Sequence, residues 1–103
     1  MSKLTTQRVR SPIVGSRFYA GALEALVHIK DGADVLLVRE FDNRHDKNAV
    51  AVFAGKQQLG HVLAEVARTL APLMDARGAS EMLATFSCNS SGRATVAVNI
   101  ERA

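Results

Sequence analysis

The sequence predicts a small, mainly β domain of the α+β class, with about six short strands and one main α-helix. The chain of 103 residues, of which 48% are hydrophobic, suits one domain around a single core. Short apolar segments alternate with turns rich in Gly, Asn and Asp, an arrangement typical of a small barrel or sandwich. Only residues 64–77 carry the apolar repeat of an amphipathic helix.

The chain begins with a basic segment that precedes the first predicted strand. It contains Lys3, Arg8 and Arg10 and no acidic residue, and Ser11 ends it before a proline. We expect residues 1–11 to form a flexible tail and residues 12–103 to form the single domain. No apolar segment follows the charges, so we do not expect a secretory signal.

Three strands are predicted in the first half of the chain. Residues 13–19 are rich in β-branched and aromatic side chains. Residues 24–30 alternate between apolar and polar, which predicts a strand, although helical propensity leaves a short helix open over residues 22–28. Residues 35–41 form a nearly continuous apolar strand that leads into seven polar residues, 42–48.

Two hairpins follow these strands. The first joins strands 49–54 and 59–62 through a short turn that contains glycine. The second joins strands 82–88 and 94–100 through a loop of Asn, Ser and Gly, residues that favour tight turns.

The predicted helix, 64–77, lies between the two hairpins. Its apolar residues share one face, and Gly78 is a suitable residue to end it. Pro72 removes one backbone donor, so we expect a kink there or two shorter helical pieces.

Composition and motifs exclude several function classes. The net charge of +3 is compatible with a polyanionic partner, and no apolar run approaches the ~18 residues of a membrane span. The single cysteine, Cys88, predicts a reduced, cytoplasmic setting, and its place on a strand predicts a core residue. Common catalytic motifs are missing, and His28, His45 and His61 lack the pair spacing of a zinc site. We therefore expect no enzyme, no metal and no cofactor.

Two parts of the sequence favour nucleic-acid binding. Arg17 beside Phe18 and Tyr19 places a phosphate-binding cation next to aromatic faces, as in proteins that bind single strands; the alternative is that the aromatic pair belongs to the core. Asp46 is the candidate for an outward acceptor, which would contact a sugar hydroxyl or a base amino group because a carboxylate repels phosphate. His61 either contacts a phosphate or simply ends a strand.

Three motifs, in order along the chain, resemble the HIRAN domain. They are Gly15-x-Arg17-Phe18-Tyr19-x-Gly21, then Leu37-Val38-Arg39-Glu40-x-Asp42-Asn43-x-x-Asp46-x-Asn48-Ala49-Val50-x-Val52, then Leu59-Gly60-His61-Val62 with Glu65-x-Ala67 and Leu70-Ala71-x-Leu73. Two departures are visible. Arg44 and His45 stand where the family often has Pro and an aromatic residue, and Leu63 and Ala64 replace a Lys after the Gly-His pair.

The resemblance implies an OB-like β-barrel with helices that binds single-stranded DNA at its free 3′-hydroxyl end. By position, Arg17 would contact phosphate and Phe18 would stack on a base. Asn43 and Asp46 would line the pocket for the terminal nucleotide, with Asp46 accepting from the 3′-hydroxyl, and His61 would meet a phosphate. The DNA-binding residues carried over are Arg17, Phe18, Tyr19, Asn43, His45, Asp46 and His61.

We therefore expect a DNA-binding module that acts on single strands or 3′ ends, in DNA repair or replication. A helicase or a nuclease is the expected kind of protein partner, and no membrane is involved. The alternative is a protein-interaction adaptor that has this fold and does not bind DNA. A third hypothesis is a hydrolytic accessory that uses Asp42, His45 and Asp46 with a metal ion.

Overall fold

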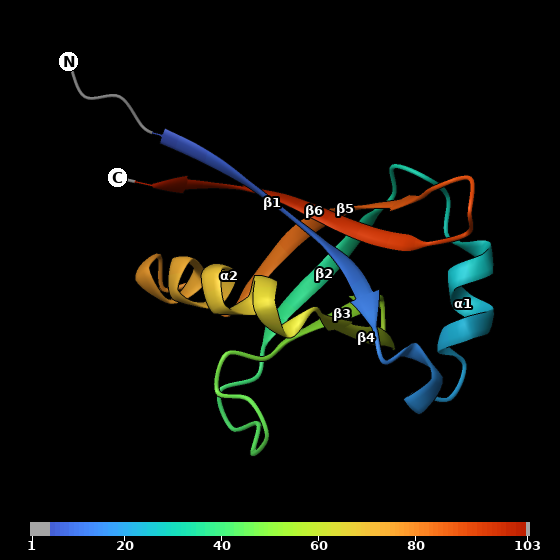
Figure 1. Cartoon of the computed structure of the whole chain (residues 1–103), viewed down its shortest axis with the longest axis horizontal. Helices are drawn as coiled ribbons and strands as arrows, with labels where there is room; N and C mark the ends of the chain where they lie inside the picture. Colours follow the sequence, from blue (N-terminus) through green and yellow to red (C-terminus); the bar gives the residue numbers. More distant parts are fainter. Residues whose placement is uncertain (1–4, 103) are drawn as a thin grey trace.

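Six antiparallel strands close into a barrel in the order β1-β4-β3-β2-β5-β6 (Figure 1). The computed structural model describes residues 5–102. Its elements are β1 (Thr5–Val14), η1 (Ser16–Phe18), α1 (Ala22–His28), β2 (Asp34–Arg39), β3 (Val50–Ala54), β4 (Gln57–Val62), α2 (Ala64–Ala76), β5 (Glu81–Cys88) and β6 (Ala94–Arg102). The predicted OB-like barrel of about six strands with one main helix is confirmed.

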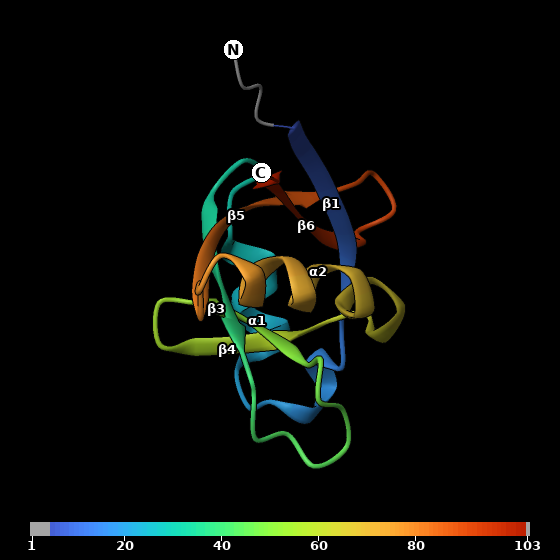
Figure 2. The ribbon, with the colours of Figure 1, turned by 90° about the vertical axis from the view of Figure 1, so that its left-hand side faces the viewer.

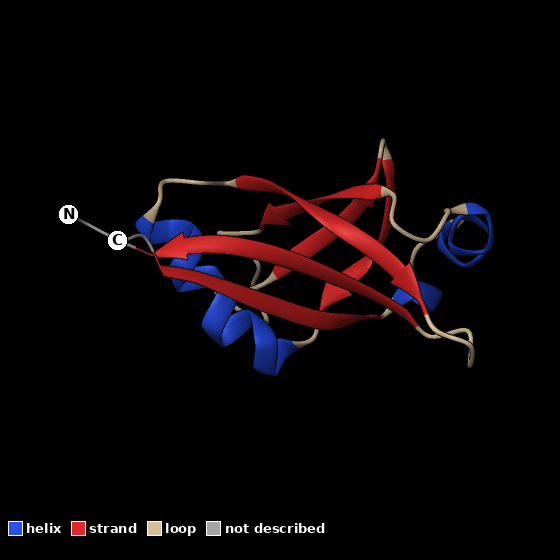
Figure 3. Cartoon of the chain, turned by 90° about the horizontal axis from the view of Figure 1, so that it is seen from above, coloured by secondary structure: helices blue, strands red, loops and turns tan. Residues whose placement is uncertain are grey.

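Strand β1 closes the barrel by pairing with two neighbours in turn. Its residues 5–12 pair with β6, whereas Ile13 and Val14 pair with Val62 and His61 of β4. Seen from above, the long β1 and β6 strands lie side by side (Figure 3). His61 is paired with Val14, which lies two residues before the start of η1, so the end of β1 brings His61 close to η1.

The predicted flexible tail over residues 1–11 is wrong where the structure describes it, because residues 5–11 belong to β1. Only Val9 is apolar there, and it is buried together with Ser11 while Arg8 and Arg10 face outward. Backbone pairing with β6 therefore holds a segment that has almost no apolar pattern of its own. The rest of the predicted tail, residues 1–4, lies outside the described residues.

Two further predictions are corrected between β1 and β2. The strand predicted over residues 13–19 ends at Val14, because Gly15 takes a φ of 76° and turns the chain into η1. The strand predicted over residues 24–30 is instead helix α1, as the alternative for residues 22–28 allowed. Ala22 is fully buried at the start of this helix, so tertiary packing outweighs the local alternation.

Helix α2 lies across one end of the barrel, and α1 lies at the other end (Figures 1 and 2). The buried residues of α2 join the core of the barrel; they are Ala67, Leu70, Ala71 and Met74. The helix is not divided at Pro72. The carbonyl that loses its helical partner belongs to Arg68, an exposed residue. The prediction of two shorter pieces is therefore wrong.

The core of the barrel consists of aliphatic residues around one aromatic ring. Its largest fully buried side chains are Phe86, Leu37, Leu59, Leu70, Met74, Ile100, Val50 and Val52. Both predicted hairpins are confirmed, β3-β4 and β5-β6. Cys88, predicted to be a core residue, is exposed at the end of β5. No helix within residues 5–102 has the length and apolarity needed to cross a membrane.

Candidate functional site

The polar segment between β2 and β3 is an ordered loop, which we call the polar loop (residues 40–49). Its two ends are joined because the backbone N–H of Glu40 donates to the carbonyl of Ala49 at 2.9 Å. Inside the loop, the Ala49 N–H donates to the carbonyl of Asp46 at 3.1 Å, and the Asn43 N–H donates to the carbonyl of Glu40 at 3.3 Å. The backbone of the loop is thus held by its own hydrogen bonds.

Asn43 organises the tip of the polar loop. Its Oδ1 accepts from the backbone N–H groups of His45 at 2.8 Å and Asp46 at 3.0 Å, an Asx turn, while its Nδ2 donates to Glu40 Oε1 at 3.0 Å. Asp46 continues the pattern, since its Oδ1 accepts from the backbone N–H of Asn48 at 2.9 Å. The second carboxylate oxygen of Asp46 has no hydrogen-bond partner within residues 5–102 and can accept one.

A chain of side chains connects the polar loop to η1 and β4. The Tyr19 hydroxyl lies 3.2 Å from His61 Nδ1, and His61 Nε2 lies 2.7 Å from Glu40 Oε1. One imidazole tautomer satisfies both contacts: Nε2–H donates to Glu40, and Nδ1 accepts from the Tyr19 hydroxyl. The two rings are 5.7 Å apart at 46°. His61 therefore links three segments far apart in sequence, through Tyr19 on one side and the Glu40 carboxylate on the other.

The surroundings of Tyr19 disfavour its ionised form. Partial burial raises the pKa of the Tyr19 hydroxyl, and the negative charge of Glu40 raises it further, although a hydrogen bond with Gln58 acts in the opposite direction. Tyr19 therefore stays a neutral donor to His61 at neutral pH.

Glu40 joins the candidate site although the family resemblance gave it no binding role. It appears in the motif that carries the resemblance, between Arg39 and Asp42, but nothing in the sequence shows that it meets His61, 21 residues later. Its Oε1 accepts from both His61 and Asn43 and so fixes two of the predicted residues at once.

Arg39 anchors the polar loop to α2. Its Nη1 donates to the carbonyls of Lys47 at 3.1 Å and Ala49 at 3.0 Å. Its Nε and Nη2 donate to the two carboxylate oxygens of Asp75 at 2.9 and 3.1 Å. The guanidinium also lies 4.5 Å from the centre of the Phe41 ring. The side chain of Arg39 is only 4% exposed, so its donors satisfy groups that water reaches poorly.

The Arg39–Asp75 pair makes stability depend on pH in the acid range. The hydrogen bond from Arg39 lowers the pKa of Asp75, partly opposed by burial. Because the folded-state pKa is depressed, the contribution is complete above the ordinary carboxyl pKa of 3.8 and is lost as pH falls through the folded-state pKa.

We expect Asp75→Asn to have a lower free energy of unfolding than the wild-type protein at pH 7. As the pH falls below 5, this variant should lose less of its remaining stability than the wild-type protein loses. Urea unfolding at a series of pH values measures this. Glu24→Gln, at an exposed position of α1, serves as control and should keep the wild-type pH profile. Parallel profiles for Asp75→Asn and wild type would contradict the assignment. Asp75 is 42% exposed, so solvent screening keeps the effect modest.

The remaining predicted site residues are exposed and are not joined to this chain of contacts. Arg17 and Phe18 lie on η1, where Phe18 is 79% exposed, and His45 is exposed in the polar loop. Within residues 5–102 none of these three side chains makes a hydrogen bond. The structure thus brings together Tyr19 and His61 with Asn43 and Asp46 of the loop, and leaves Arg17, Phe18 and His45 facing solvent.

The described part of the chain also bears on the metal hypothesis. Within residues 5–102 no three His, Cys, Asp or Glu side chains gather in a way that could hold a metal ion. Asp42, His45 and Asp46 are thus not arranged as a metal site.

Comparisons with solved structures agree with the fold. A protein from Lactobacillus plantarum has the same fold, with a TM-score of 0.77 over 96% of this chain and 100% of its own, at 22% identity. The HIRAN domain of human HLTF matches with a TM-score of 0.63 and 26% identity, over 95% of this chain and 75% of that chain.

The sequence comparisons name a family. A Fanconi-associated nuclease 1 homolog of Oryza sativa subsp. japonica is 37% identical over 71 residues, 65% of this chain. This chain spans only 7% of the length of that relative. The family model for the HIRAN domain matches residues 6–101, nearly all of the sequence. The chain therefore belongs to the HIRAN domain family.

Proposed function

We propose that this HIRAN domain binds single-stranded DNA and recognises its free 3′-hydroxyl end. The observation that carries the proposal is the chain of contacts from Tyr19 through His61 and Glu40 to Asn43, because it holds the polar loop beside η1. Residues that the family resemblance assigns to one site are thus joined by direct contacts, although they come from three segments.

Asp46 is the acceptor for the 3′-hydroxyl. One of its oxygens is used by the backbone of the loop, which fixes the carboxylate, and the other remains free within the described residues. A hydroxyl can donate to that oxygen, whereas a terminal phosphate would bring a second negative charge to it. A carboxylate in such a position therefore discriminates between two ends that differ only in this group.

Arg17 and Phe18 supply the general part of the affinity. A solvent-facing guanidinium can neutralise a phosphate, and the exposed Phe18 ring offers a face for a base. His61 uses both ring nitrogens on Tyr19 and Glu40, so in this arrangement it orients the site, and a phosphate contact would require it to exchange a partner. His45 is free to rotate toward a terminal base from the loop.

In this proposal the chain binds DNA without catalysing a reaction, in the cytoplasm, and a helicase or nuclease acts on the DNA it holds. A nuclease homolog is among the relatives, and only a small part of that relative corresponds to this chain, which supports this kind of partner.

We expect Arg17→Ala to weaken the binding of a labelled single-stranded oligonucleotide and to reduce the slope of log K against log salt by about 1. Fluorescence anisotropy at several salt concentrations measures both quantities. Arg8→Ala, which removes an exposed cation from the first half of β1, should leave the slope at its wild-type value. Equal slopes for Arg17→Ala and wild type would remove Arg17 from the interface. Failure of the wild type to bind at low salt would contradict the proposed function.

A further inference from the structure

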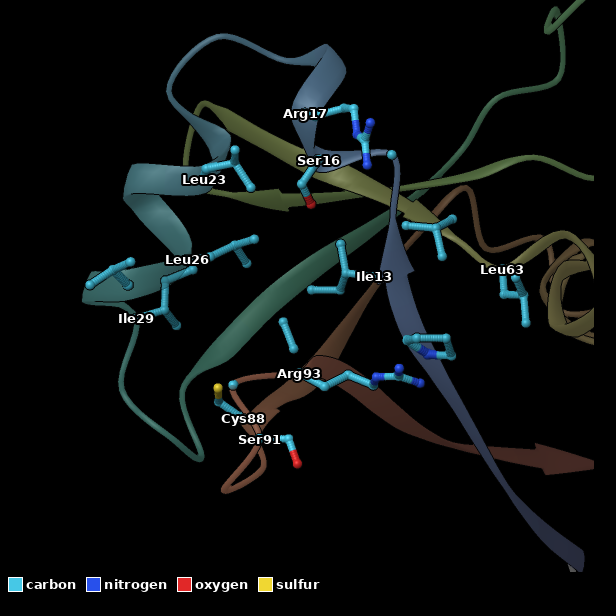
Figure 4. Close-up of a pocket in the computed structure, with 16 residues that line it drawn as sticks. Ile13, Ser16, Arg17, Leu23, Leu26, Ile29, Leu63, Cys88, Ser91 and Arg93 are labelled. Atoms are coloured by element: carbon cyan, nitrogen blue, oxygen red, sulfur yellow. The ribbon is translucent and has the colours of Figure 1, made fainter.

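A groove separate from the polar loop lies between the end of β1, helix α1 and the start of β6 (Figure 4). Its volume is about 1480 Å³. Most of its lining is apolar, and the larger aliphatic side chains in it are Ile13, Leu23, Leu26, Val27, Ile29 and Leu63. The residues that line it include no aromatic side chain.

Helix α1 leaves apolar side chains uncovered along this groove. Leu23 is 60% exposed and Val27 is 79% exposed, and because they are four residues apart they share one face of the helix. The adjacent side of α1 is held by the fully buried Ala22 and by Leu26, which packs against the core. The exposed pair is therefore not a by-product of poor docking, since α1 is anchored through other residues.

The two charged residues that line the groove are both cations. Arg17 and Arg93 lie on either side of Ile13 (Figure 4), and no Asp or Glu is among the lining residues. A surface with aliphatic walls and cations at its edge attracts a ligand that is apolar on one side and negative at its margins.

These features favour a peptide over a nucleic acid. Bases held without sequence preference usually stack on aromatic rings, and this groove has none. An amphipathic helix instead places aliphatic residues, spaced by three or four, into an aliphatic groove. We propose that the groove binds an acidic amphipathic helix of a partner protein, with Leu23 and Val27 contacting its apolar face and Arg93 and Arg17 contacting its carboxylates. This site is distinct from the polar loop and goes beyond the proposed DNA binding.

The probe is a fluorescein-labelled designed peptide of about 15 residues, with Leu at helical spacing on one face and Glu on the other. Matched probes have Lys in place of every Glu, or the same composition in scrambled order. We expect the acidic amphipathic peptide to bind in the micromolar range and at least about tenfold more tightly than either matched probe. Val27→Asp should abolish binding, and Arg93→Glu should weaken it about tenfold. Both positions are exposed, so the variants should fold, which circular dichroism verifies.

Several results would overturn the assignment. They are no binding of the acidic peptide at about 100 μM, equal binding of the Lys peptide, or unchanged binding by folded Val27→Asp. If a single-stranded oligonucleotide displaces the peptide that is bound to the Arg17→Ala variant, the groove is instead a nucleic-acid surface. Self-association of the wild-type protein in sedimentation, abolished by Val27→Asp, would make a second copy of the chain the occupant.

Discussion

Replacing Gly60 by alanine is expected to lower the free energy of unfolding by about 3 kcal/mol or more. The residue has a φ of 146°, which L side chains rarely adopt. A Cβ there would overlap the backbone carbonyl oxygen of Val14 and would lie 3.0 Å from Ile13 Cγ2. Because the first of these atoms belongs to the backbone of β1, a rotamer change cannot relieve the overlap, and the β1-β4 pairing has to shift.

This substitution should also damage the site. Gly60 precedes His61, and Val14 pairs with His61, so a shift of β1 against β4 separates Tyr19 from His61. Urea unfolding gives the stability, and anisotropy gives the binding of the oligonucleotide.

Gly55→Ala is the matched control for Gly60→Ala. Gly55 also has a positive φ, of 58°, but a Cβ there meets nothing within 4 Å, so we expect a loss of about 1 kcal/mol and unchanged binding. Comparable stability of the two variants would show that close approach of the backbone at Gly60 does not matter.

Arg39→Met is expected to lower the free energy of unfolding by about 3 kcal/mol. Methionine retains much of the apolar stem but none of the donors, so the carbonyl of Lys47 and the carboxylate of Asp75 lose the guanidinium, and the carbonyl of Ala49 keeps only the backbone N–H of Glu40. The carbonyl of Ala49 lies at a buried residue, where water cannot readily replace the guanidinium. The polar loop should therefore lose its anchor and much of its order.

Hydrogen exchange of the loop amides, together with urea unfolding, measures this effect. The control is Arg77→Met, which removes an exposed arginine whose Nη1 donates to the carbonyl of Glu101 at 3.0 Å. We expect that variant to lose less than about 1 kcal/mol and to keep wild-type protection in the loop. If the loop amides of Arg39→Met are protected from exchange as well as those of the wild-type protein, Arg39 does not anchor the loop.

The parts of the fold that the sequence predicted are those with strong local patterns. The hairpin β3-β4 has apolar runs on both sides of a glycine turn, and α2 has a full apolar stripe. The first half of β1 has neither, because within residues 5–11 only Val9 is apolar. The buried Ser11 donates to the carbonyl of the next residue, Pro12, and accepts from the N–H of Leu63, which only the folded chain brings to it.

In the candidate site, too, the local contacts could be predicted from the sequence and the long-range contacts could not. Asx turns are local, so the structural use of Asn and Asp in the polar loop was within reach of the sequence. The bridge from Glu40 to His61 and the anchor from Arg39 to Asp75 join residues 21 and 36 positions apart, so they form only when the elements pack together. The residues whose roles were missed are those that connect elements, and no local pattern marks them.

The most direct test of 3′-end recognition compares two short labelled single strands that differ only in their last group, a 3′-hydroxyl or a 3′-phosphate. Anisotropy titrations at moderate salt should give at least about tenfold tighter binding of the hydroxyl end by the wild-type protein. Asp46→Ala should bring the two affinities close together, while Asp42→Ala, at an exposed position of the same loop, should preserve the preference. Equal wild-type affinity for the two ends would contradict recognition of the 3′-hydroxyl.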